Sequence, residues 1–280
     1  MATVNEVFQK LDDWAPFETQ MSFDNSGLLV GRGERTVTGV LVALDVTLPV
    51  VEEARRLGCD LILAHHPVIF DPVRRITGED PNGRILLALA EYGIAAICAH
   101  TNLDAAEGGV NDCLAQRLAL KETSLLEQSG VDRAGRPYGI GKVGDAHRES
   151  TAEEYATFVK QVLNAASVRF VDAGRPVRRV AVGGGSCGSM LMDAVKAGCD
   201  TFVTADVKYN IFLDAKALGI NLMDAGHYAT EQVVCPALVD FVEREFPELS
   251  VHLTQVHPEV YQEAWSTESR TVALAKNGKS

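Results

Sequence analysis

The chain has 280 residues, of which 46% are hydrophobic and 23% are charged, so we expect a folded globular protein rather than a disordered or fibrous one. Its net charge of −12, without a concentrated basic stretch, argues against duplex nucleic acid as a partner. No apolar stretch is long enough to cross a bilayer and the N-terminus lacks the apolar core of a signal peptide, so we expect no membrane partner.

The first part of the chain alternates predicted helices with short apolar strands. Thr3 followed by Glu6 forms a capping-box pattern, which predicts the first helix. Two more helices are predicted to begin at Thr47 and at Asp80, each with a proline in its first turn. Such alternation indicates an α/β fold with largely parallel pairing. The predicted strands are Gly39–Leu44, Asp60–Ala64 and Ile94–Ala99.

A polar, glycine-rich stretch at residues 130–144 separates this part from the rest of the chain. We place the domain boundary near its start, which gives a first α/β lobe of residues 1–128 and a second of residues 129–280. A further helix is predicted from Thr151. The end of the chain, from about Thr267, has weak periodicity and is expected to be a mobile tail.

Two segments of the chain share one pattern, which indicates an internal repeat. Leu57–Asp60 (LGCD) matches Ala197–Asp200 (AGCD), and a hydrophobic strand follows both. The alignment sets His66 opposite Asp206, so equivalent strand ends carry unequal polar residues. We therefore predict two related α/β lobes that arose by duplication and face each other across one asymmetric site.

Two adjacent histidines follow the strand that ends at Ala64. In a continuing strand His65 and His66 would point to opposite faces, but Pro67 turns the chain out of the sheet and lets both serve one cavity. The carboxyl ends of such strands are where open α/β sheets place ligands. A pair of ordinary surface or core histidines is the competing interpretation.

Three further candidates follow other predicted strands of the repeat. His227 and Glu231 are four residues apart and would project from the first turn of a helix, although Glu231 could simply cap that helix. Asp104 follows another strand and could equally form a polar turn. Each signal is ambiguous alone, but all five side chains are expected on one rim.

Three imidazoles and two carboxylates form a mixed nitrogen and oxygen set. Such a set suits zinc, manganese, iron or nickel and suits calcium poorly. Five ligands exceed what one tetrahedral ion with an open position needs, so we predict two divalent metal ions on His65, His66, Asp104, His227 and Glu231. Two adjacent ions can turn water into a nucleophile.

Other polar residues near these strands have two interpretations each. His100 is our candidate catalytic residue, as a proton shuttle, but it could instead orient a ligand. Asp45 and Thr47 follow the predicted strand Gly39–Leu44, and capping of the next helix by Thr47 is the stronger interpretation of this pair. The turn 183–186 (GGGS) could cradle an anion, although it lacks the full phosphate-loop pattern. Lys208 could neutralise a phosphate or be an ordinary surface lysine.

Six cysteines are scattered along the chain without a C-x-x-C pair. Cys59 and Cys199 lie in apolar contexts and are expected to be buried thiols. This usage fits a reducing compartment better than a disulfide framework, so we expect a cytoplasmic protein.

Seven motifs in this order make the sequence recognisable: FDNSGLLVG, ALDVT, LAHHP, AHTNLDAAEGGVND, the GGGS turn, ADVKYN and DAGHYATE. Together they resemble the Nif-three-like dinuclear-metal family, also called the GTP cyclohydrolase I type 2 family. The resemblance implies two-lobed subunits in a toroidal homohexamer, with metal sites facing an internal cavity. The family's ligands fall on the same five residues. Many members carry histidine where this chain has Asn210, so an acid at that position is not expected here.

The activity implied by the resemblance is metal-dependent hydrolysis that opens the purine ring of GTP. Nothing in the sequence itself recognises guanine. A two-metal phosphoesterase is a second enzymatic possibility. A non-catalytic metal-binding scaffold or metal chaperone is a third, since a fold does not fix a function.

Overall fold

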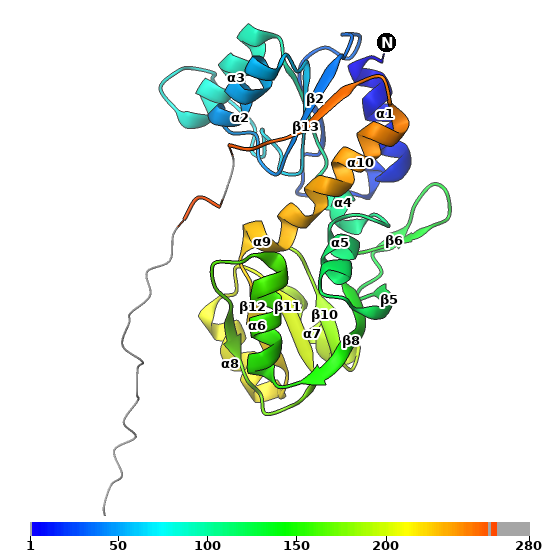
Figure 1. Ribbon diagram of the computed structural model, residues 1–280, viewed down its shortest axis with the longest axis vertical. Helices are drawn as coiled ribbons and strands as arrows, with labels where there is room; N and C mark the ends of the chain where they lie inside the picture. Colours follow the sequence, from blue (N-terminus) through cyan, green and yellow to red (C-terminus); the bar gives the residue numbers. More distant parts are fainter. Residues whose placement is uncertain (1, 257–258, 262–280) are drawn as a thin grey trace, which may run out of the picture.

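The computed structural model describes residues 2–256 and 259–261, and they form a mixed α/β protein with one large sheet in each predicted lobe and a separate two-stranded sheet (Figure 1). The mixed α/β class expected from the alternating pattern is confirmed. The predicted tail from Thr267 lies outside the described residues. No helix in the described part of the chain is both long and apolar enough to cross a membrane.

The first sheet has three parallel strands at its centre, with β13 added parallel to β2 and β1 added antiparallel to β4. Helices α2 and α3 join the central strands. The sheet order is β1 (Gly27–Val30), β4 (Ala95–Cys98), β3 (Leu61–Ala64), β2 (Gly39–Ala43) and β13 (Ser250–Leu253). The helices of this lobe are α1 (Val4–Trp14), α2 (Leu48–Leu57), α3 (Pro81–Tyr92) and α10 (Cys235–Glu245), with the 3-10 turn η1 (Phe17–Thr19).

The second sheet has the same parallel centre, in which β10, β11 and β12 are joined by α7 and α8, flanked by antiparallel strands. Its order is β5 (Lys121–Leu125), β8 (Lys142–Ser150), β10 (Val177–Val182), β11 (Thr201–Thr204), β12 (Asn221–Asp224) and β9 (Arg169–Val171). Its helices are α5 (Val110–Arg117), α6 (Ala152–Leu163), α7 (Leu191–Lys196) and α8 (Tyr209–Leu218). The remaining elements are the hairpin β6 (Gly130–Val131) and β7 (Pro137–Tyr138), the short helices α4 (Thr101–Ala105) and α9 (His227–Glu231), and the 3-10 turns η2 (Gly188–Met190) and η3 (Gln232–Val234).

The central strands are buried on both faces because helices cover both sides of each sheet. In β2, Val40 and Val42 pack with α1 and α10, whereas Leu41 and Ala43 pack with α2 and α3. Each fully buried valine or leucine contributes roughly 1.5–3 kcal/mol to the free energy of unfolding. Two buried faces explain why these strands are continuous apolar runs rather than alternating ones.

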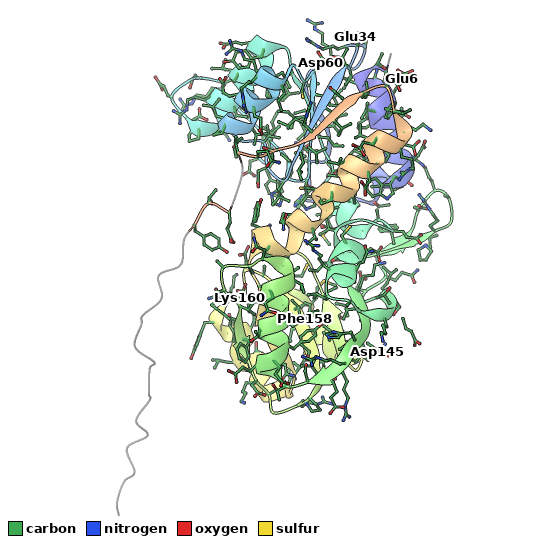
Figure 2. All side chains as sticks on the ribbon, in the orientation of Figure 1. Glu6, Glu34, Asp60, Asp145, Phe158 and Lys160 are labelled. Carbon is green, nitrogen blue, oxygen red and sulfur yellow. The ribbon has the colours of Figure 1, made fainter. Side chains whose placement is uncertain are left out.

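Local sequence signals account for most helix boundaries. The Thr3 side chain caps α1 by accepting from the Glu6 amide, and the Thr3 amide in turn donates to the Glu6 carboxylate; Figure 2 labels Glu6 at this end of the helix. Thr151 and Glu154 form the same capping box on α6. The helices predicted to begin at Thr47 and Asp80 do so, and both end at glycines in the left-handed region.

Two strands cross the division that the sequence suggested. β5 lies within residues 1–128 but pairs with β8 of the second sheet, and β13 lies within residues 129–280 but pairs with β2 of the first. Helix α10 also packs in the core of the first lobe, through Leu238 and Phe241. The division into lobes stays a proposal, and its limits follow the sheets rather than one cut in the chain.

Candidate metal centre

The candidate residues follow parallel strands of both sheets, and their ligand atoms lie together in overlapping groups. His65 and His66 follow β3, and their amides both donate to the carbonyl of Leu44. Asp104 lies on α4, which begins shortly after β4. His227 and Glu231 lie on α9, shortly after β12.

His65 is fully buried and its orientation is fixed by the main chain. Its Nδ1 lies 2.8 Å from the carbonyl oxygen of Ala99, and because a carbonyl only accepts, Nδ1 carries the proton. Its Nε2 faces two carboxylates, 3.7 Å from Asp104 Oδ1 and 3.8 Å from Glu231 Oε2. Within the described structure, neither this Nε2 nor Asp104 Oδ1 has a hydrogen-bond partner.

Two buried polar atoms without partners are costly unless another group satisfies them. The two atoms here face each other at 3.7 Å, which is more than hydrogen-bond distance, so a metal ion between them would bond to both once the imidazole nitrogen is deprotonated. Burial is the main cause that raises the pKa of Asp104 to about 6. The residues present therefore fit a divalent metal ion.

Glu231 lies at the centre of the cluster and is only 3% exposed. Its Oε2 is 2.8 Å from His66 Nε2 and 2.9 Å from His227 Nε2. Burial would raise the pKa of this carboxyl, but the hydrogen bonds from His227 and His66, together with the nearby imidazole of His65, outweigh burial and hold the pKa well below its ordinary value. Glu231 is therefore an anion that faces His65, His66 and His227 together.

Two aspartates orient the other imidazoles, and the sequence did not assign them this role. Asp45 Oδ1 is 2.7 Å from His66 Nδ1, and Asp206 Oδ2 is 2.7 Å from His227 Nδ1. Carboxylates bonded to the far nitrogen of a metal-ligating histidine fix the ring and raise its basicity. The repeat had set Asp206 opposite His66, but nothing in the pattern paired it with His227.

The helix cap that the sequence favoured next to Asp45 is also present. Thr47 does cap α2, because its side chain accepts from the Val50 amide at 3.4 Å.

His100 lies beside the same cluster, with its ring centroid 5.2 Å from that of His65 and 5.5 Å from that of His66. Its Nδ1 is 2.8 Å from Asp24 Oδ1. The pKa of Asp24 is lowered because hydrogen bonds from His100 and Thr101 outweigh the effect of burial. The role of His100 as a proton shuttle stays a prediction.

The glycine turn after β10 does not offer its amides to an anion. The amide of Gly184 donates to Asn111 Oδ1 and that of Gly185 to Thr230 Oγ1, each at 3.0 Å. A Cβ on Gly185 would lie 2.0 Å from Glu231 Oε1. The turn therefore makes room for Glu231, and the phosphate-cradle interpretation is not supported by these contacts.

Among the residues that the structure describes, three overlapping groups of side chains could hold a metal ion, each with ligand atoms within 4.8 Å of one another. One group is His66, His227 and Glu231, the second is His65, Asp104 and Glu231, and the third is His65, His66 and His100. All five predicted ligands and His100 thus lie together. Their function as ligands, and the number and identity of the ions, are predictions.

Metal binding at this site should release protons. Burial alone would lower the pKa of His66 and His227, but hydrogen bonds with Glu231 and with Asp45 or Asp206 raise these values to about 10 and about 9. Both rings are therefore protonated at pH 7.5 without metal, and an ion must displace protons to bind.

Calorimetric titration of zinc into metal-free protein, in two buffers of different ionisation enthalpy, measures this release. We expect more than about one proton per chain, and an affinity that weakens as the pH falls. The variant His227→Gln should release about one proton fewer. Equal binding enthalpies in both buffers would mean that no protons are released, and would contradict the assignment of both rings as protonated.

Comparison with known proteins identifies the family. A family model described as Duf34/NIF3 (NGG1p interacting factor 3) matches residues 2–260. Proteins named GTP cyclohydrolase 1 type 2 homolog match with 34% identity in Clostridium perfringens, covering 86% of this chain and 90% of that protein, and with 36% identity in Streptomyces coelicolor, covering 91% and 92%. A hypothetical protein of Staphylococcus aureus, solved by crystallography, superposes with a TM-score of 0.87 at 32% identity, covering 94% of this chain and 99% of that one. The chain therefore belongs to the Duf34/NIF3 family.

Proposed function

We propose that the chain binds two divalent metal ions and uses them to hydrolyse a small substrate. The observation that carries the proposal is the position of Glu231, which belongs to two of the three potential metal-binding groups. One of these groups adds His65 and Asp104, and the other adds His66 and His227. A carboxylate that belongs to both groups could serve two ions at once, which supports a dinuclear centre over a single-ion site.

The metal ions, when bound, would supply Lewis acidity and a water nucleophile at neutral pH. The chain's own residues orient the ligands and accept or return protons. Asp45 and Asp206 hold two imidazoles in the orientation that ligation needs. Asp24 holds His100 through Nδ1, which leaves Nε2 as the atom that can accept or return a proton.

Solvent exposure on one side of the cluster favours a catalytic metal site over a structural one. The His65 side chain is fully buried, but the side chains of His66 and His227 are 21% and 35% exposed. A structural metal site is normally closed by protein ligands, whereas a catalytic site keeps one position accessible. A substrate could therefore approach from the side of His66 and His227.

GTP is the first substrate to test, because the curated relatives are named GTP cyclohydrolase 1 type 2 homologs. Protein loaded in turn with zinc, manganese, iron and nickel is incubated with GTP and with phosphoesters, and the products are separated by chromatography. We expect turnover that falls about 100-fold or more in His100→Asn, with metal content unchanged. No turnover with any metal would favour a scaffold or metal chaperone.

Self-association is part of the same proposal. Helix α8 is rich in apolar residues, yet Ala215 is its only buried residue, and Tyr209 and Leu213 are 77% and 54% exposed. Such a face is typical of a contact between subunits. Light scattering on the metal-loaded protein tests the toroidal hexamer that the resemblance implies.

A further inference from the structure

Two exposed phenylalanines lie beside the candidate metal centre. Phe23 is 62% exposed and Phe70 is 47% exposed, and their ring centroids are 6.5 Å apart at an interplanar angle of 58°. Phe70 in turn meets His100 edge-on, with centroids 6.2 Å apart at 82°. The rings thus form a continuous row from solvent to the imidazoles that face Glu231.

Hydrogen bonds hold the two loops that carry these rings. Asp24, next to Phe23, accepts from the amide of Thr101 at 3.0 Å and bonds the ring of His100. The side-chain amide of Asn25 donates to the carbonyl of Ile69, the neighbour of Phe70. The backbone next to each phenylalanine is therefore held by hydrogen bonds of its chain neighbour.

Exposed aromatic rings that are held in place cost less entropy on binding than mobile ones, and they gain from burial by a ligand. We infer that Phe23 and Phe70 form a stacking platform that binds a planar aromatic ring of the substrate while the metal centre acts on another part of the same molecule. We call this pair the aromatic platform. The inference rests on the proposed function, because it assigns the substrate class of that site.

The position of the platform favours a small molecule over a protein partner. It consists of two side chains and adjoins His100, whose ring lies 5.5 Å from the partly exposed His66. A ring on the platform would therefore bring its substituents within reach of the centre. Stacking on an aromatic side chain tolerates any flat ring, so the inference names a heteroaromatic compound rather than one base.

Two hydroxamic acids test the platform on the metal-loaded full chain. Acetohydroxamic and phenylacetohydroxamic acid share one metal-binding group, and only the second carries a ring. We expect phenylacetohydroxamic acid to bind roughly tenfold tighter or more, measured by calorimetry. The double variant Phe23→Leu/Phe70→Leu, which keeps apolar side chains, should lose this preference but keep its metal content and its affinity for acetohydroxamic acid. Phe170→Leu, the same change at an exposed phenylalanine of β9, should keep the preference.

Equal affinity for the two acids in the wild type, or a preference that survives in the double variant, would overturn the platform alone. If neither acid binds, the proposed metal-dependent function fails and this inference fails with it. Light scattering tests the other possible occupant of the aromatic platform, which is a second copy of the chain. A change of oligomeric state in the double variant with the ring preference intact would make the pair a subunit contact and overturn the inference.

Discussion

Replacing Glu231 with glutamine should remove bound metal from the protein. The side chain keeps its size, but the anion that faces three imidazoles becomes neutral, and it belongs to two of the three potential metal-binding groups. Losing the shared carboxylate should therefore weaken both ions together. We expect metal content, measured by elemental analysis, to fall from about two ions per chain to nearly none.

The matched control is Glu149→Gln. Glu149 is exposed and pairs with Arg178 at 2.8 Å, so the same chemical change is made at the surface, where it should alter neither metal content nor stability appreciably. Circular dichroism of both variants establishes that they fold. A Glu231→Gln protein that retains the wild-type amount of metal would show that the cluster is not the binding site.

Gly185→Ala should have the second largest effect, through a clash with the same carboxylate. Gly185 has a φ of +62°, and an added Cβ would lie 2.0 Å from Glu231 Oε1. The left-handed conformation costs an alanine about 1–2 kcal/mol, and the contact must in addition displace Glu231. We expect a lower melting temperature and at least a tenfold loss of metal affinity, of the order seen when a supporting group of a metal site is lost.

Gly198→Ala separates these two causes. Gly198 has a similar φ of +73°, and nothing lies within 4 Å of the position its Cβ would take. This variant should lose comparable backbone stability and keep its metal. An equal loss of metal in both variants would mean that general destabilisation, rather than the contact with Glu231, is responsible.

Signals carried by neighbouring residues made much of the fold predictable. Capping boxes, glycines after helices and doubly buried strands act within a few residues, so the central units of both lobes could be outlined from sequence. Strand β5 (KETSL) carries no such signal because its side chains are mostly exposed. The pairing of β13 with β2 also escaped prediction, since it joins segments more than half the chain apart.

The ligands of the candidate site were predictable from the sequence, but the residues that orient them were not. The five predicted ligands follow parallel strands, and the rule that ligands bind at the carboxyl ends of such strands selected them, although the strands belong to two different sheets. The partners that orient them depend on tertiary placement. Asp206 is exposed and has a φ of +51°, and its bond to His227 cannot be inferred from spacing. Asp24 likewise reaches His100 from a loop 76 residues away.

Anomalous diffraction at the absorption edge of the bound metal tests the central claim most directly. Crystals grown from protein purified without added metal, and then soaked with manganese or zinc, would serve. We predict two peaks per chain, one beside His65 and Asp104 and one beside His66 and His227, with Glu231 between them. A single peak, peaks elsewhere, or none after soaking would contradict the dinuclear centre and leave these side chains as structural groups of the fold.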